Sequence, residues 1–167
     1  MIIKSAVRFY LIFITLFTLL ACKEEQIATV GDYAPEIATF NLSGEQVLLQ
    51  QLKGKMIVLN FWSESCSVCI AELKRFDHIM KQYSNKVHFL AINIDGDNSN
   101  TAQVISKNQL SLPIVKDQLH ITSERYGLIG TPTTFIIDPE GKILYKSEGL
   151  ITEQTLTKLL TQHGRIK

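Results

Sequence analysis

The sequence predicts an α/β domain built on a mixed, partly parallel sheet. Short apolar runs alternate with segments whose apolar residues recur every three or four positions, the spacing of an amphipathic helix. Strands that alternate with helices favour parallel pairing. Near the C-terminus two further apolar runs flank Asp138-Pro139-Glu140-Gly141, a turn signal that indicates an antiparallel hairpin. The length of 167 residues suits one domain with small additions.

The first half of the predicted domain opens with a hairpin and continues with a strand–helix–strand unit. Residues 36–49 are typical of two short strands that turn at Ser43-Gly44. Met56–Trp62 is a nearly continuous apolar run, which indicates a strand buried on both faces. Val87–Ile94 is the next strand, and parallel strands joined through a helix imply a right-handed crossover. The helix between them begins at the cysteines and presents one apolar face, made of Cys69, Leu73, Phe76, Met80 and Tyr83.

The second half contains shorter elements, which we expect in the order helix, strand, helix, hairpin, helix. Their predicted ranges are 101–110, 112–115, 121–126, 133–138 with 142–147, and 152–163. The helix and strand at 101–115 therefore form an insert between the strand–helix–strand unit and the hairpin.

The N-terminal residues differ in kind from the rest of the chain. Lys4 and Arg8 precede an apolar stretch from Phe9 to Leu20, which is short for a membrane span of roughly 20 apolar residues. A basic start, an apolar stretch and a small residue before the cut describe a secretory signal peptide. We therefore expect residues 1–21 to be a signal peptide.

The end of this segment, Leu19-Leu20-Ala21-Cys22, resembles a bacterial lipobox. This resemblance implies that Cys22 is the lipid-modified first residue of the mature protein, which would lie outside the cytoplasm on a bacterial membrane, on the periplasmic side if there are two. Acyl chains contribute about 0.8 kcal/mol per buried CH₂, so several chains would hold the protein there. Residues 22–33 are polar and fit a tether, and residues 34–167 fit the folded domain. A plain signal peptide and an uncleaved anchor remain alternatives.

The other two cysteines, Cys66 and Cys69, close too small a loop to stabilise the chain much by entropy. They lie after a buried strand and at the start of a helix, whose N-terminus stabilises a thiolate and lowers its pKa. We expect Cys66, nearest the helix end, to be the attacking thiolate. Cys69 lies one turn further in, and we expect it to stay protonated until it resolves the mixed disulfide.

Other uses of the cysteine pair have weaker support. A zinc site needs about four ligands, and the sequence has neither a second cysteine pair nor histidines at ligand spacing. Covalent haem attachment needs a histidine after the second cysteine, where Ile70 stands. We therefore expect no metal and no cofactor, although a purely structural disulfide stays open. The formal net charge of +1 gives no strong field for nucleic acid, and we expect a monomer.

Two segments resemble the active-site motifs of thioredoxin-fold proteins. The segment 60–69, Asn-Phe-Trp-Ser-Glu-Ser-Cys-Ser-Val-Cys, resembles their active-site segment, and 130–135, Gly-Thr-Pro-Thr-Thr-Phe, resembles their cis-proline loop. The resemblance implies that Pro132 is a cis proline and that Thr131 lies beside the cysteines, both in contact with a bound substrate chain. We also expect Trp62 to be a substrate-binding residue, as a wall of the site and not as a catalytic group.

The insert, the early hairpin and Glu72, three residues after Cys69, are similar to the TlpA/ResA-like branch of this fold. Members of that branch are exported, membrane-anchored thiol–disulfide reductases, several of which serve cytochrome c maturation. The resemblance implies that this protein reduces disulfides in exported proteins and is recharged by a membrane thiol electron donor. Two alternatives remain: a disulfide-forming oxidase with the same site, and a copper or haem carrier that uses the dithiol as ligands.

The spacing of Glu72 from Cys69 by itself predicts a role for this residue. At three residues from Cys69 it flanks the apolar face of the helix, so we expect its carboxyl beneath the sulfurs, partly desolvated, with a raised pKa and able to exchange a proton with Cys69. The alternative is a solvated glutamate near a helix start, where negative charge is favourable. Asn60 stands where plain thioredoxins carry a buried aspartate, which leaves Glu72 as the expected local proton carrier.

Overall fold

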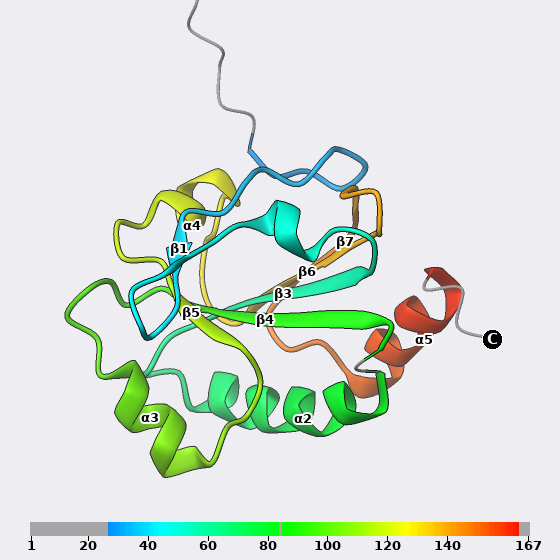
Figure 1. Ribbon diagram of the computed structural model, residues 1–167. Helices are drawn as coiled ribbons and strands as arrows, with labels where there is room; N and C mark the ends of the chain where they lie inside the picture. Colours follow the sequence, from blue (N-terminus) through cyan, green and yellow to red (C-terminus); the bar gives the residue numbers. More distant parts are fainter. Residues whose placement is uncertain (1–26, 84, 164–167) are drawn as a thin grey trace, which may run out of the picture.

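The computed structural model describes residues 27–83 and 85–163 (Figure 1). The predicted signal peptide and Cys22 lie outside these residues. The elements follow in the order β1 (Thr39–Phe40), β2 (Gln46–Val47), η1 (Leu49–Leu52), β3 (Met56–Trp62), α2 (Ser67–Tyr83), β4 (Val87–Asn93), α3 (Thr101–Asn108), β5 (Ile114–Lys116), α4 (Ile121–Arg125), β6 (Thr133–Ile137), β7 (Ile143–Glu148) and α5 (Glu153–His163). Within the described residues, no helix is both long and apolar enough to cross a membrane.

The strands form one mixed sheet in the order β2-β1-β5-β4-β3-β6-β7. β3 pairs in parallel with β4 along its whole length and antiparallel with β6, and β5 adds a second parallel pair on the other side of β4. β1, β2 and β7 pair antiparallel at the two ends of the sheet. This arrangement confirms the predicted α/β class, the mixed sheet and the helix–strand insert, here α3 and β5.

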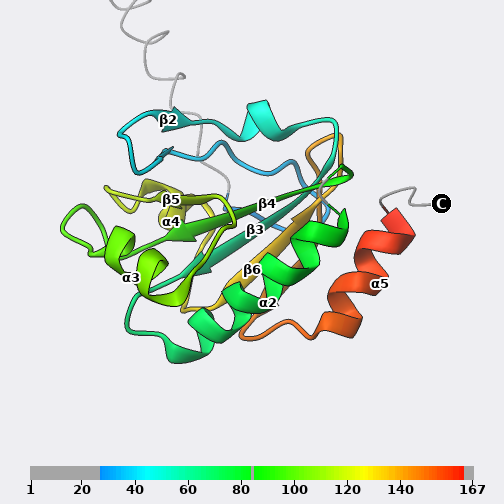
Figure 2. The same cartoon turned by 60° about the horizontal axis from the view of Figure 1, so that its bottom comes forward.

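Helices cover both faces of this sheet. α2 and α5 lie side by side on one face, whereas the N-terminal segment, η1 and α4 cover the other (Figures 1 and 2). Successive side chains of a strand point to opposite faces. On β3, Val58 and Trp62 therefore belong to the core under α2, whereas Leu59 and Phe61 belong to the core on the opposite face. The same alternation directs Asn60 toward α2.

The core opposite α2 contains three aromatic rings from distant parts of the chain, packed against one another in tilted and edge-to-face arrangements. Phe61 and Phe135 lie on neighbouring strands, and the centroid of the Tyr126 ring lies 5.2 and 5.0 Å from theirs. The Tyr126 hydroxyl donates a hydrogen bond to the Pro35 carbonyl over 2.8 Å. This bond attaches the segment that leads into β1 to the end of α4.

The N-terminal hairpin is shorter than the sequence predicts. Each of its strands has two residues, and Leu49–Leu52 forms a 3-10 helix where the end of a strand was expected. The physical reason is the Glu36 carboxylate, which accepts the backbone N–H groups of Leu49 and Gln50. A side chain thus takes the donors that a longer strand would offer to its neighbour.

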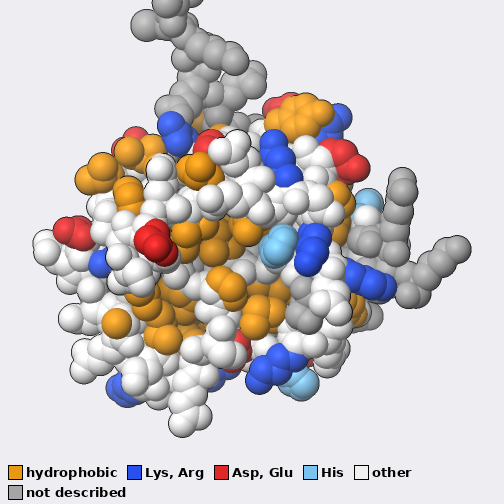
Figure 3. Space-filling view, in the orientation of Figure 1, with side chains coloured by type: hydrophobic (Ala, Val, Ile, Leu, Met, Phe, Trp, Pro, Cys, Tyr) orange, Lys and Arg blue, Asp and Glu red, His pale blue; other side chains and the backbone are white. Residues whose placement is uncertain are grey.

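Hydrophobic side chains gather across the middle of the face seen in Figure 3, over β4 and β5 and beside α2. β5 pairs with β4 only along Ala91–Asn93. The first half of β4 therefore has no neighbouring strand on that side among the described residues. Some of the hydrophobic side chains around it are exposed on this face of the molecule.

Candidate active site

The two cysteines lie where β3 has ended and α2 begins, and they form a disulfide with their Cα atoms 5.2 Å apart. Cys66 is half-buried, whereas Cys69 has no exposed surface. The predicted difference between an accessible and a buried cysteine is therefore confirmed.

The first turn of α2 directs backbone donors at Cys66. The Cys69 N–H donates to Cys66 Sγ over 3.2 Å, and the Ile70 N–H donates to the Cys66 carbonyl over 3.2 Å. Cys66 thus occupies the position of a helix N-cap, with sulfur in place of the usual oxygen acceptor. A negative sulfur at this point gains an N–H donor and the positive end of the helix dipole, which favours the thiolate after reduction.

The loop before β6 faces the same sulfur. The Thr131–Pro132 peptide bond is cis, as predicted. The Thr131 carbonyl oxygen lies 3.8 Å from Cys66 Sγ, and the Thr131 hydroxyl lies 3.4 Å from the Ser63 hydroxyl. Ile129, three residues before Pro132, is 86% exposed. The structure therefore brings the predicted cis-proline loop and the cysteines together. In this loop Thr131 is half-buried and Pro132 is buried.

Trp62 supports the site from the core side. It has no exposed surface, and it belongs to the same buried cluster as Cys69. Its indole Nε1 has no hydrogen-bond partner among the described residues. The prediction that Trp62 contacts the substrate is therefore wrong for this disulfide form, because the side chain is packed in the core behind the site and has no surface to offer a substrate.

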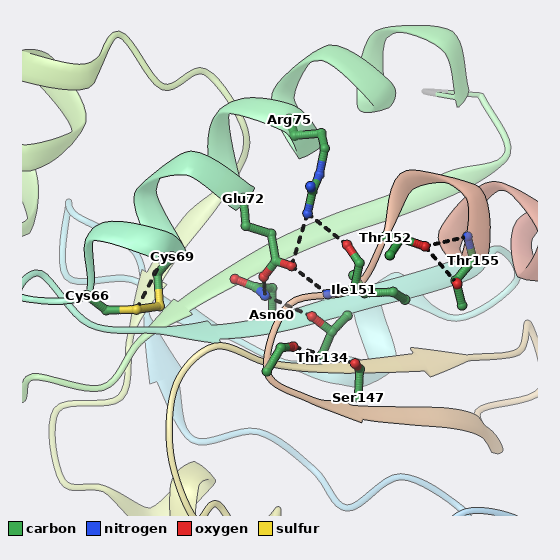
Figure 4. A network of polar contacts seen from close by, with 11 residues as sticks. Asn60, Cys66, Cys69, Glu72, Arg75, Thr134, Ser147, Ile151, Thr152 and Thr155 are labelled. Atoms are coloured by element: carbon green, nitrogen blue, oxygen red, sulfur yellow. Dashed lines mark hydrogen bonds and ion pairs between the residues drawn. A yellow bond between two sulfur atoms is a disulfide. The ribbon is translucent and has the colours of Figure 1, made fainter.

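The Glu72 carboxylate is completely buried and is held by donors from three parts of the chain (Figure 4). Oε2 accepts a hydrogen bond from Asn60 Nδ2 over 3.0 Å. Oε1 accepts the Ile151 N–H over 2.9 Å and lies 3.3 Å from Arg75 Nη2. Arg75 Nη2 also donates to the Ile151 carbonyl over 2.7 Å. Together Glu72 and Arg75 bind both backbone groups of Ile151, in the connection between β7 and α5.

Burial raises the pKa of Glu72, as predicted, although the Ile151 N–H, the Asn60 amide and the Arg75 guanidinium each act to lower it. The carboxylate is directed toward Asn60 and Ile151 and not into the space beneath the sulfurs (Figure 4). The Asn60 side chain lies between the carboxylate and the disulfide. Asn60 is thus the side chain that hydrogen-bonds to Glu72 on the side of the carboxylate that faces the disulfide.

Several of these contacts were not predicted from the sequence. Arg75 lies three residues after Glu72 on one helix, a spacing at which an ion pair is expected, so a local signal was present. Thr134, whose hydroxyl accepts the second N–H of Asn60, and Ile151 are 74 and 79 positions from their partners and leave no such signal.

The loop before Cys66 is also attached to the insert. The Glu64 carboxylate accepts the Asn100 N–H over 3.1 Å and the Thr101 hydroxyl over 3.0 Å, at the start of α3. The Glu64 N–H donates to Asp95 Oδ2 over 2.7 Å. Glu64 thus holds the N-cap residue Asn100 by its backbone N–H and the first helical residue Thr101 by its hydroxyl, whereas the Asn100 side chain makes no cap hydrogen bond.

Comparisons with known proteins agree with this geometry. Residues 30–146 match the AhpC/TSA family. The thiol-disulfide oxidoreductase ResA of Bacillus cereus is 29% identical over 161 residues, 96% of this chain and 90% of the relative. The thioredoxin-like protein YneN of Bacillus subtilis is 31% identical over 141 residues, 83% of this chain and 82% of the relative.

Solved structures show the same fold. A protein from Chlorobium tepidum described as a thiol:disulfide interchange protein DsbE superposes with a TM-score of 0.75 at 24% identity, over 82% of this chain and 99% of that one. The exposed lipoprotein thioredoxin Etrx1 of Streptococcus pneumoniae superposes with a TM-score of 0.66 at 26% identity, over 77% and 99%. The chain therefore belongs to the AhpC/TSA family, and it is a thiol–disulfide oxidoreductase of the ResA type with a thioredoxin fold and Cys66 and Cys69 as its Cys-x-x-Cys pair.

Proposed function

We propose that this protein is exported, is held at a membrane by lipid on Cys22, and reduces disulfides in other exported proteins. Residues 1–21 fit the signal peptide, 22–33 the tether and 34–167 the thioredoxin-like domain. Two groups of similar proteins support the proposal. Those named ResA are thiol–disulfide oxidoreductases, and the pneumococcal thioredoxin of similar structure is itself described as an exposed lipoprotein.

The observation that carries the mechanism is the contrast between the two sulfurs. Cys66 is half-buried and receives an N–H donor from the helix, whereas Cys69 is wholly buried. In the proposed reaction the Cys66 thiolate attacks one sulfur of a substrate disulfide. That S–S bond breaks, and the other substrate sulfur leaves with the electron pair and takes up a proton.

The second step closes the cycle on the protein. The Cys69 thiolate attacks Cys66 Sγ in the mixed disulfide, the Cys66–Cys69 bond forms, and the substrate is released with its second sulfur reduced. The substrate has gained two electrons and the protein has lost them. A membrane thiol electron donor returns the two electrons by the reverse exchange. We assign Glu72 to holding the proton that Cys69 gives up before this attack.

We place the substrate chain along the cis-proline loop. The Thr131 carbonyl lies 3.8 Å from Cys66 Sγ, so a chain bound to the backbone at Thr131 has its disulfide within reach of the sulfur. Pro132 has no N–H, which leaves Thr131 as the backbone group that the loop offers beside Cys66.

Trapping tests the order of attack. The Cys69→Ala variant lacks the resolving thiol and should accumulate a long-lived mixed disulfide through Cys66, visible on non-reducing gels and by mass spectrometry. The matched variant Cys66→Ala should trap little, because Cys69 is buried. Equal trapping by both variants would contradict the assignment. Trapped partners that carry Cys-x-x-Cys-His would assign the protein to cytochrome c maturation, and varied exported proteins would assign it to general disulfide repair.

The direction of exchange separates a reductase from an oxidase. We expect a reduction potential near the roughly −270 mV of thioredoxin, whereas a value near about −120 mV, that of a strong oxidant, would reassign the protein to disulfide formation. Equilibration with glutathione buffers of known ratio measures it.

Membrane attachment has its own test. In cells that express the full chain, Cys22→Ser should move the protein from the membrane fraction to the soluble fraction, and mass spectrometry should show loss of the acyl mass. Cys66→Ser, which removes a different thiol, should leave the distribution unchanged.

A further inference from the structure

The Asn60 side chain is a buried amide with one unsatisfied atom. It is 1% exposed, and Nδ2 donates both of its hydrogens, to Glu72 Oε2 over 3.0 Å and to Thr134 Oγ1 over 2.9 Å. Oδ1 has no hydrogen-bond partner among the described residues. Figure 4 shows this oxygen on the side of the amide that faces the Cys66–Cys69 disulfide. A buried acceptor without a partner is costly, and a disulfide sulfur has no hydrogen to offer it.

The orientation of this amide depends on the charge of Glu72. An ionised carboxylate only accepts hydrogen bonds, so the NH₂ group of Asn60 must point toward it. The Asn60 Oδ1 atom then points toward the cysteines. Oε1 is occupied by the Ile151 N–H and Arg75, so a proton taken up by Glu72 goes to Oε2, the atom that faces Asn60. A protonated Oε2 donates a hydrogen bond, so the oxygen of the Asn60 amide, and not its nitrogen, must face it.

Every partner of the amide tolerates this exchange of oxygen and nitrogen. The Thr134 hydroxyl accepts from Nδ2 in the first orientation and can donate to Oδ1 in the second, because a hydroxyl does both. The atom that faces the cysteines changes from an acceptor to a donor at the same time.

We propose that Asn60 is a positioning residue that links the protonation of Glu72 to that of Cys69 by presenting its oxygen to a Cys69 thiol and its N–H to a Cys69 thiolate. Cys69 lies one helical turn before Glu72 on the same buried face of α2. When the disulfide is reduced, the Cys69 S–H supplies the donor that Oδ1 lacks. When Cys69 loses its proton, the reversed amide donates to the thiolate, and Glu72 carries one proton.

This linkage rests on the resolving role of Cys69 in the proposed function. Cys69 must be a thiolate when it attacks Cys66 Sγ and protonated when the protein waits for substrate. One proton is held by either Cys69 or Glu72, and the linkage is one of equilibrium that needs no direct transfer. Among the described residues, Arg75 is the charged group in contact with Glu72, and Cys66 is the titratable group beside Cys69. β3 and β6 contribute Asn60 and Thr134, which do not titrate.

A double-mutant cycle on the reduced full-length protein tests the proposal. Cysteine labelled with ¹³C at Cβ reports the titration midpoint of Cys69 separately from that of Cys66 and Cys22. In Glu72→Gln the oxygen of the new side chain can accept the hydrogen bonds from the Ile151 N–H and Arg75. Its NH₂ group then faces Asn60 and donates to it, as a protonated carboxyl would. We expect the Cys69 midpoint to fall, with about tenfold more thiolate at a given pH. In the Asn60→Leu background the same change at Glu72 should leave the midpoint where it was.

The outcomes separate the proposal from its alternatives. An equal fall in both backgrounds means that the charge of Glu72 acts on Cys69 without Asn60 and overturns the proposal. No fall in either background means that the two groups are not linked, which also overturns it. Glu64→Gln removes a negative charge from the neighbouring loop without touching Asn60, and it should not move the midpoint.

A second measurement needs no change at Asn60. In the reduced wild-type protein, the side-chain ¹⁵N signal of Asn60 should titrate with the same midpoint as Cys69, whereas a signal constant through that midpoint would contradict the two orientations. Trapping by Cys69→Ala does not depend on Asn60. Failure of the linkage with successful trapping therefore rejects this proposal alone, and failed trapping rejects the proposed order of attack.

Discussion

The Glu72 carboxylate and the Ile151 backbone N–H form a buried hydrogen bond of 2.9 Å between residues 79 positions apart in the chain. With Arg75, which binds the carbonyl of the same residue, this bond attaches the active-site helix α2 to the connection that leads into α5. A residue expected to serve the chemistry of the cysteines therefore also holds two helices on one face of the sheet together.

Replacing Glu72 by alanine should destabilise the fold. The change leaves the N–H groups of Ile151 and Asn60 buried without their acceptor, and each unsatisfied group costs about 1–3 kcal/mol. We expect a loss of about 3 kcal/mol in the free energy of unfolding of the disulfide form, measured by urea titration. Glu140→Ala, in the exposed turn between β6 and β7, is the control and should change stability by no more than about 0.5 kcal/mol. Equal losses would show that the buried contacts of Glu72 contribute nothing.

The pH dependence of stability should reveal the raised pKa of Glu72. In the unfolded chain the carboxyl of Glu72 has its ordinary pKa of 4.5, and burial raises this pKa in the folded protein. Between the two values the folded state binds more protons, so stability falls as the pH rises through that window. The unfolding free energy of the wild type, relative to that of Glu72→Gln, should therefore fall as the pH rises from 4.5 and level off above the folded pKa. A constant difference, measured by urea titration at several pH values, would contradict the raised pKa.

Glu64→Ala should loosen the start of α3. The Asn100 N–H and the Thr101 hydroxyl lose their acceptor, and the net loss of a hydrogen bond costs about 1 kcal/mol. Hydrogen exchange at the Asn100 N–H should speed up, while exchange in β3 changes little. Glu64→Gln keeps one acceptor oxygen, so its exchange rate at the Asn100 N–H should lie between those of the wild type and Glu64→Ala. A rate equal to that of Glu64→Ala would mean that the charge of Glu64, and not its hydrogen bonds, holds the start of α3.

Tyr126→Phe should weaken the attachment of the N-terminal segment. The aromatic cluster keeps its rings, and only the hydroxyl that donates to the Pro35 carbonyl is removed. We expect a loss of about 1 kcal/mol in the free energy of unfolding. Tyr33→Phe is the matched control, since the Tyr33 side chain is 65% exposed, and it should be neutral within error. A neutral Tyr126→Phe would mean that water replaces the lost bond without cost.

The regular elements were predictable because their signals are local. The apolar run of β3 follows from burial on both faces, and the spacing of Cys69, Leu73 and Phe76 follows from the period of a helix. The position of the cysteine pair at a helix start and the cis bond at Pro132 also follow from short motifs. In the insert the observed ends of α3 and β5 differ from the predicted ends by one or two residues. α3 ends earlier than predicted because Gln109 adopts a left-handed backbone with φ 54°.

By itself the sequence determined the fold class, the βαβ unit and the cysteine pair with its accessible and buried members, because spacing within one element decides these features. Only the tertiary structure decided what surrounds the pair. The donors on Glu72 come from β3, α2 and the β7–α5 connection, and Glu64 contacts the start of α3, 36 positions further along the chain. Whether a buried carboxylate faces sulfur, an amide or a backbone N–H depends on how close separate elements pack, and that distance has no local signature in the chain.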